Sequence, residues 1–230
     1  MKVLVCSERF LPRFGADRVL VLLGQRLAAL GHHVVWVGVR FDESLSASAG
    51  DRSSGRAEIV PIPTEGVEYQ RLDAHTAGWL RDNWNRIAPG ERPGLAIVGG
   101  WPFYAALPFL REQCPVVAVD FGAVPLDGYA GAARAIQEQL RGLRSRHLGQ
   151  ASLIVAISRF IAESQSQADS HGRVPVASLL LGADHMDAVP PSPRPPGSPS
   201  VATIAALHRA GKKAILNLGE IGRASCRERV

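Results

Sequence analysis

The apolar positions of the chain fall into short runs that alternate with stretches of helical spacing. Residues 2–6 and 34–37 are mainly apolar, and between them leucines recur every three or four positions over residues 18–30, before Gly31. Short apolar runs are typical of strands buried in a parallel sheet, and leucines at this spacing are typical of a helix that packs on such a sheet. The beginning of the chain is therefore predicted to fold as strand, loop, helix and strand.

The same alternation continues to residue 181. Further strands are predicted at residues 58–62, 95–98, 115–119, 153–157 and 174–181, and helices at residues 69–86, 103–113 and 132–148, with Ser158 as the N-cap of another helix. Strands that alternate with helices indicate an α/β fold with a doubly wound parallel sheet, Rossmann-like in architecture.

The loop at residues 7–17 is the first place to look for function, because ligands of open parallel sheets usually bind beyond the carboxyl ends of the strands. A dinucleotide-binding loop carries Gly-x-Gly-x-x-Gly directly after the first strand. Here the loop contains only Gly15, together with Pro12. The sequence therefore disfavours an NAD- or FAD-dependent oxidoreductase.

Composition and charge exclude several other classes of protein. The chain of 230 residues is 46% apolar with a net charge of +5, and no apolar run approaches the about 18 residues of a membrane-spanning helix. No basic cluster with interleaved aromatic residues indicates a nucleic-acid partner, and the spacing of the histidines and cysteines does not indicate a metal site. Without a signal-peptide pattern, we expect a cytoplasmic protein. We interpret Arg141, Arg144 and Arg146 as the solvated end of a helix. Contact with an acidic acceptor or with the inner face of the membrane is the alternative.

The end of the chain differs in composition from the rest. A stretch rich in Pro and Ser indicates a linker. The chain is accordingly divided into a Rossmann-like domain at residues 1–187, a linker at 188–200, the beginning of a second domain at 201–219, and a tail at 220–230. Within the tail, residues 221–230 match one translated frame of a common sequencing adapter. We interpret the tail as an artefact of a reading frame cut short near Gly219.

Three segments carry a resemblance to a known family. Residues 14–20 read Phe-Gly-Ala-Asp-Arg-Val-Leu, and the helix that follows them ends in Gly-His. Residues 155–160 read Val-Ala-Ile-Ser-Arg-Phe, and residues 181–184 read Leu-Gly-Ala-Asp. These are similar to the Gly-Gly-Ala-Glu-Arg-Val-Leu opening, the Val-x-Ala-Val-Ser junction and the Asn-Gly-Val-Asp turn of family 4 retaining glycosyltransferases, which have the GT-B fold. The chain departs from the family in Phe14, Asp17 and Leu181, which replace glycine, glutamate and asparagine.

The resemblance implies that this domain holds the acceptor, that a second domain holds the nucleotide sugar, and that the first loop approaches the donor diphosphate. It assigns Gly15, Asp17 and Arg18 to the donor, because backbone N–H groups at a helix N-terminus bind anions. The structural alternatives are a loop end for Gly15, a helix cap for Asp17 and a solvated side chain for Arg18.

Two later loops supply the acceptor-side candidates. Gly100 and Trp101 follow the strand at residues 95–98, and an aromatic ring there suits a sugar ring, with plain packing as the alternative for Trp101. Asp120 and Phe121 stand where many family members carry a histidine near the reacting sugar. We assign Phe121 to the acceptor, and Asp120 to catalysis as a carboxylate that binds an acceptor hydroxyl or transfers a proton. The alternative for Asp120 is a turn aspartate that binds local amides.

The resemblance implies a parent enzyme that moves a hexose from a nucleotide sugar to a glycan or lipid hydroxyl without a metal or cofactor. The 230-residue chain itself is expected to be inactive, because most donor contacts would belong to the second domain. The competing hypothesis is a non-catalytic α/β module that binds a ligand or a partner.

Overall fold

The computed structural model describes residues 1–43, 45 and 57–179, which fall within one compact unit at Met1–Leu181. The predicted linker, second domain and tail lie outside the described residues, as does the turn at 181–184.

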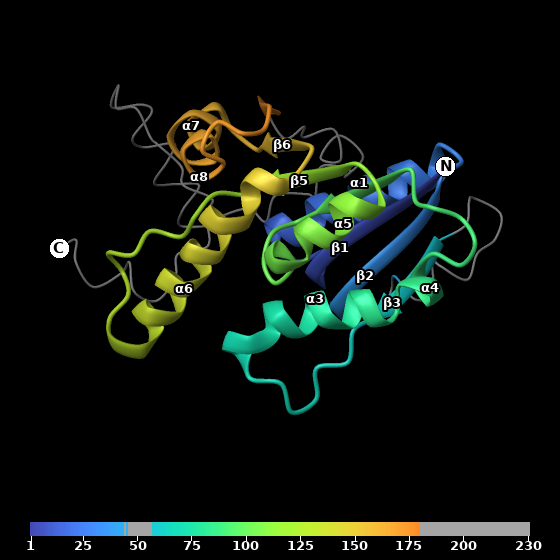
Figure 1. Cartoon of the computed structure of the whole chain (residues 1–230), viewed down its shortest axis with the longest axis horizontal. Helices are drawn as coiled ribbons and strands as arrows, with labels where there is room; N and C mark the ends of the chain where they lie inside the picture. The colour runs from blue at the N-terminus through green and yellow to red at the C-terminus, as the bar shows by residue number, and fades with distance from the viewer. Residues whose placement is uncertain (44, 46–56, 180–230) are drawn as a thin grey trace, which may run out of the picture. The chain divides into compact units, whose positions relative to one another are not determined.

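In the described part of the chain, seven parallel strands form one sheet in the order β3-β2-β1-β4-β5-β6-β7 (Figure 1). The strands are β1 (Lys2–Phe10), β2 (His33–Phe41), β3 (Ala57–Pro61), β4 (Leu95–Val98), β5 (Val116–Asp120), β6 (Leu153–Ala156) and β7 (Val176–Ser178). The helices are α1 (Gly15–Ala29), α3 (Leu72–Asp82), α4 (Trp84–Ile87), α5 (Leu107–Gln113), α6 (Gly131–His147), α7 (Arg159–Ile161) and α8 (Gln167–Asp169). Short 3-10 turns are η1 (Tyr69–Arg71), η2 (Tyr104–Ala106) and η3 (Leu148–Gln150), and η4 (Ala162–Ser166) is a π-helical turn. The predicted doubly wound, Rossmann-like sheet is confirmed.

Helices cover both faces of the sheet, and the central strand β1 is buried on each. Leu4 and Cys6 are fully buried in a core cluster that includes side chains of α3 and α5. Val3 and Val5 are fully buried in a second cluster that includes Leu20 of α1. Because successive side chains of a strand point to opposite faces, a strand covered on both faces is apolar throughout. This is why the beginning of the chain is a continuous apolar run.

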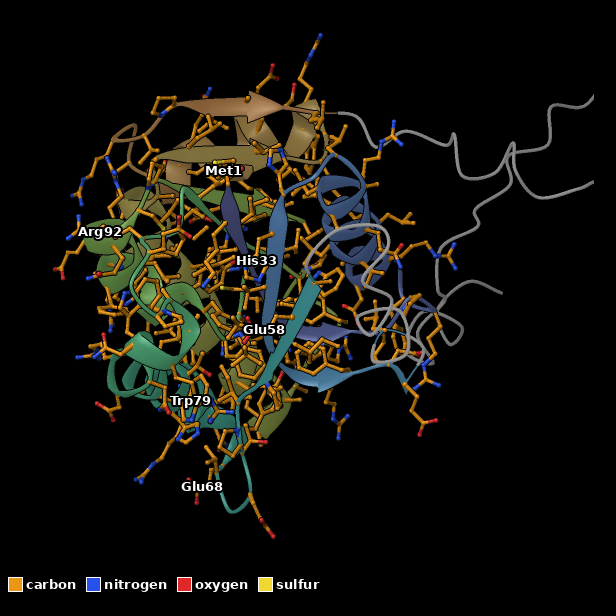
Figure 2. The ribbon with its side chains drawn as sticks, turned by 90° about the vertical axis from the view of Figure 1, so that its right-hand side faces the viewer. Met1, His33, Glu58, Glu68, Trp79 and Arg92 are labelled. Atoms are coloured by element: carbon orange, nitrogen blue, oxygen red, sulfur yellow. The ribbon has the colours of Figure 1, made fainter. Side chains whose placement is uncertain are left out.

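The amino ends of the first three strands lie at one edge of the sheet. Figure 2 shows Met1, His33 and Glu58 near the amino ends of β1, β2 and β3. The His33 backbone N–H donates to the Met1 carbonyl at 3.0 Å, and His33 Nε2 lies 3.7 Å from Glu58 Oε2. In a parallel sheet the carboxyl ends of these strands therefore meet at the opposite edge, where the candidate site lies.

The first two strands are longer than predicted. β1 continues to Phe10 and β2 to Phe41, and these two residues pair across the strands. Phe10 is fully buried, and its ring stacks on that of Phe41 with centres 5.2 Å apart. The polar residues 7–9 gave the segment the composition of a loop, but cross-strand pairing keeps them in the sheet. The loop after β1 therefore begins only at Leu11.

Helix boundaries were predicted less well than helix positions. The helix expected over residues 69–86 is divided into η1, α3 and α4, because Asn83 ends α3 and its Nδ2 donates to the Trp79 carbonyl at 2.9 Å. Ser158 is confirmed as an N-cap, since its Oγ accepts the Ile161 N–H at 3.2 Å. Among the helices of the described ranges, none has the length and apolar character that crossing a membrane requires.

Candidate functional site

The direction in which the chain adds strands reverses between β1 and β4. From β1 the chain runs outward to β2 and β3, and β4 then pairs with the other side of β1. Such a reversal leaves a crevice beyond the carboxyl ends of the strands, where ligands of open α/β sheets bind. A cavity of about 240 Å³ lies at this place, walled by the carboxyl ends of β1, β4 and β5, the first turns of α1 and one side of α6. We call it the switch-point cavity.

Charged side chains at the end of β1 and the start of α1 form one wall of the switch-point cavity. Arg9 Nε lies 3.4 Å from Asp17 Oδ2 and 4.0 Å from Glu8 Oε2. The Arg9 guanidinium also lies 4.9 Å from the centre of the Phe14 ring, and the Arg13 guanidinium lies 5.1 Å from it. Cation–π contact with Phe14 therefore helps to hold Arg9 beside the two carboxylates.

Burial raises the pKa of both carboxyl groups on this wall. For Glu8, burial has the largest effect, Arg9 opposes it, and the negative charge of Asp17 adds to it. For Asp17, burial again has the largest effect, and Arg9 and a backbone hydrogen bond from Leu11 oppose it. Carboxyl groups whose pKa is raised by burial and that face a cavity are typical of ligand-binding and acid–base sites.

The loop after β4 forms the second wall. A Cβ on Gly99 would overlap Leu20 of α1, so glycine lets this helix pack closely on the end of β4. Gly100 has a φ of +94°, a conformation that favours glycine, and it is followed by Trp101, which lines the cavity. The Trp101 ring packs against Tyr69 of η1, with ring centres 4.3 Å apart and planes inclined by 41°.

Asp120, at the end of β5, is turned into the protein. Its Oδ2 accepts hydrogen bonds from Arg144 Nη2 and Ser166 Oγ, both at 2.6 Å, and its Oδ1 accepts the Gly122 N–H at 2.9 Å. The side chain is 1% exposed and is not among the residues that line the cavity. The expected contact with an acceptor hydroxyl is therefore not available in this structure, because both carboxylate oxygens already bind groups of the chain. The geometry matches the alternative of a turn aspartate.

Arg144 extends this network from β5 to the π-helical turn. Arg144 Nε lies 3.2 Å from Asp169 Oδ2, and Arg144 Nη1 donates to Gln165 Oε1 at 3.3 Å. The same Gln165 oxygen accepts the Ala123 N–H at 2.6 Å. The network ties the β5 loop, α6 and η4 together behind one wall of the cavity. π-helical turns of this kind occur frequently at functional sites.

The structure brings some of the predicted site residues to the cavity and leaves others outside. Those that line it are Asp17, Gly100, Trp101 and Phe121. Gly15 and Arg18 are exposed near the start of α1 and do not line the cavity, and Arg18 Nε donates to the Pro12 carbonyl at 2.8 Å. Asp17 does not cap α1, because the N-cap position is Phe14 and no side chain caps this helix.

Sequence reasoning did not identify Glu8, Tyr69 or the buried position of Arg144. Arg144 had a signal, because it stands four residues after Leu140 and four before Leu148, which places it in the apolar stripe of α6. Glu8 lies in the segment 7–17 to which the rule for strand ends directed attention, although no pattern singled it out. Tyr69 had no signal, since it reaches Trp101 only through the tertiary structure.

No protein-family model and no curated protein matches the sequence. Among solved structures, the chain is similar to sucrose-phosphate synthase from Thermosynechococcus elongatus, with 15% identity, a TM-score of 0.55, and 79% of this chain and 48% of that chain covered. It is also similar to TcCGT1, solved in complex with UDP, with 12% identity, a TM-score of 0.50, and 89% of this chain and 55% of that chain covered.

The chain spans about half the length of these two proteins. At such low identities the similarity shows the fold alone. The fold is the Rossmann-like α/β fold found in glycosyltransferases of the GT-B class.

Proposed function

We propose that the chain is the acceptor-side domain of a family 4 retaining glycosyltransferase, which moves a hexose from a nucleotide sugar to a hydroxyl of a glycan or lipid. The observation that carries the proposal is the position of the switch-point cavity. It lies between the first turns of α1 and the ends of β4 and β5, on a fold shared with solved glycosyltransferases. The similar structures include one in complex with UDP, which supports a nucleotide-sugar donor.

We divide the site into a donor side and an acceptor side. Gly15 and Arg18 are exposed at the start of α1, where unpaired backbone N–H groups favour an anion, and we assign them to the donor diphosphate. Asp17, which the resemblance assigns to the donor, lines the cavity beside Arg9, and we move it to the acceptor side. Trp101 and Phe121 line the cavity, and we assign them with the turn at Gly100 to the acceptor.

Asp120 receives a positioning role in this proposal. Its carboxylate is 1% exposed and accepts hydrogen bonds from Arg144, Ser166 and a backbone N–H, so we assign it to fixing the loop that carries Phe121 and not to contact with the substrate. No metal or cofactor has a part in the proposed reaction. We place the protein in the cytoplasm, with the inner face of the membrane as a peripheral site of action.

The proposal implies that the chain is part of a longer protein, so the test compares the 230-residue chain with the longest protein that the reading frame at its locus encodes. Each is incubated with UDP-, GDP- and ADP-hexoses, and the release of nucleoside diphosphate is measured with and without a panel of glycan and lipid acceptors. We expect release by the longer protein and none by the 230-residue chain. NMR of the product's anomeric proton should show the configuration of the donor.

Two results would contradict the proposal. Turnover by the 230-residue chain would refute its inactivity. A longer protein that releases no nucleoside diphosphate from any donor would refute the transferase and leave the non-catalytic α/β module.

A further inference from the structure

We propose that the switch-point cavity binds one neutral pyranose ring, packed on Trp101 and hydrogen-bonded by the carboxylates of Glu8 and Asp17. This inference rests on the proposed function, because it names the acceptor of the same site as a glycan.

The size of the cavity suits a single sugar ring. Its volume of about 240 Å³ lies below the about 300 Å³ at which pockets for drug-sized ligands begin. A nucleoside diphosphate or a long acyl chain would extend far outside it, whereas one hexose unit fills a space of this order.

The aromatic wall offers a fixed surface for the apolar face of a sugar. Trp101 is held from one side by Tyr69 and follows the positive-φ turn at Gly100, so its ring is positioned before a ligand arrives. The C–H groups of a pyranose carry partial positive charge and pack favourably on the electron-rich face of an aromatic ring.

The opposite wall offers hydrogen-bond acceptors for the hydroxyl groups. Asp17 Oδ2 is buried and receives no hydrogen bond from any residue that the structure describes, although Arg9 Nε lies 3.4 Å away. A buried carboxylate oxygen without a donor is costly, and a ligand hydroxyl would supply the missing hydrogen bond. Glu8 has a side chain that is 26% exposed and lines the same cavity.

The charged lining of the cavity suits a ligand rich in hydroxyl groups. The carboxylates of Glu8 and Asp17 and the guanidinium groups of Arg9 and Arg141 all line the cavity. A hydrocarbon chain would desolvate these groups without offering them hydrogen bonds. A neutral polyol avoids this cost, because its hydroxyls donate to the carboxylates and accept from the guanidinium groups.

The experiment uses the 230-residue chain labelled with 5-fluorotryptophan and followed by ¹⁹F NMR. The chain has four tryptophans, and the variant Trp101→Phe assigns one signal. Methyl α- and β-hexopyranosides are titrated, with inorganic phosphate and a short-chain alcohol as comparison probes. We expect the Trp101 signal to shift with a Kd of about 1 mM, the affinity that ordinary ligand efficiency allows a single sugar.

Two variants test the polar wall, and a third is their control. Glu8→Gln and Asp17→Asn should each weaken pyranoside binding about tenfold, since each removes a charge-assisted hydrogen bond. The matched control is Glu58→Gln on β3, because Glu58 lies at the opposite edge of the sheet (Figure 2) and should leave binding unchanged. An unshifted signal from buried Trp36 shows that each variant is folded.

The inference is overturned if no pyranoside shifts the Trp101 signal, if phosphate or the alcohol shifts it instead, or if all three variants bind alike. Such a failure combined with diphosphate release by the longer protein would keep the transferase and reject the sugar acceptor. Pyranoside binding without any diphosphate release would support the sugar site and reject the transferase.

Discussion

Replacing Arg144 by methionine should destabilise the domain strongly. The guanidinium is 3% exposed and lies between Asp120, at 2.6 Å, and Asp169, at 3.2 Å. Methionine keeps much of the length of the side chain but removes the charge. The Asp120 carboxylate, 1% exposed, would then remain buried with only the Ser166 hydroxyl and the Gly122 N–H as donors.

The size of the expected loss in stability depends on the Asp120 charge, which would stay buried after Arg144 is replaced. Breaking a buried ion pair by removing one partner costs about 3–5 kcal/mol, because the other charge stays buried without compensation. Two remaining hydrogen bonds to Asp120 place the expected loss near the lower end, at about 3 kcal/mol. The double variant Asp120→Asn/Arg144→Met buries no unpaired charge at that position. It should recover about 1–3 kcal/mol relative to the sum of the two single variants.

Urea unfolding of the 230-residue chain, followed by far-ultraviolet circular dichroism, measures these free energies of unfolding. Arg146→Met is the matched control, because Arg146 lies on the same helix with an exposed side chain and should change stability by less than about 0.5 kcal/mol. Equal effects of the Arg144 and Arg146 substitutions, or strictly additive single variants, would show that the buried network does not hold this wall of the cavity.

Three further predictions concern stability and reactivity. Gly24→Ala should lower the free energy of unfolding by about 1–3 kcal/mol, because the new Cβ would lie 2.7 Å from Cε2 of Trp36. Gly142→Ala has open space around its Cβ and should instead raise the free energy of unfolding by about 0.5–1 kcal/mol. Similar urea midpoints for the two variants would contradict the packing of Trp36 on Gly24. Burial lowers the pKa of His147 below its usual 6.5, and the positive charge of Arg146 adds to this effect while Asp73 opposes it. As the pH falls, the unfolded chain therefore takes up the His147 proton before the folded chain does. The free energy of unfolding should accordingly decrease as the pH drops below about 6.5. In His147→Gln this part of the stability profile should be flatter, and identical profiles would exclude the effect. Burial raises the pKa of Cys114 to about 11 and raises the pKa of Cys6 further. Both thiols should therefore react with iodoacetamide at pH 8 far more slowly than glutathione does. The measurement uses the variant Cys226→Ser, so that only these two thiols are present. Rapid labelling of either thiol in the folded protein would show that it is not buried.

Local pattern was enough for the elements and the class of the fold. A buried strand must be apolar on both faces, and a covering helix must present a stripe of apolar residues every three or four positions, so both leave a direct record in the sequence. The alternation predicted the parallel sheet, and the rule for strand ends directed attention to the carboxyl ends of β1, β4 and β5, all of which wall the cavity. The prediction was weakest at boundaries, as in the polar end of β1, where pairing with β2 outweighed composition.

The roles of individual side chains depended on contacts that no local pattern records. Asp120 occupies the expected strand end, yet its carboxylate faces inward because α6 brings Arg144 within 2.6 Å. Asp17 sits in the first turn of α1 as a capping residue would, yet it turns toward Arg9 and the cavity.

The residues alone were therefore sufficient to predict a doubly wound α/β sheet and the edge at which the cavity lies, because burial imposes a period on every strand and helix. Only the folded chain decided which of the candidate carboxylates face the cavity and which are neutralised behind it. That choice is made by charges such as Arg9 and Arg144, which meet Asp17 and Asp120 on different elements. The energy of a buried charge depends on its neighbours in space, and these are determined only when the sheet and helices have packed together.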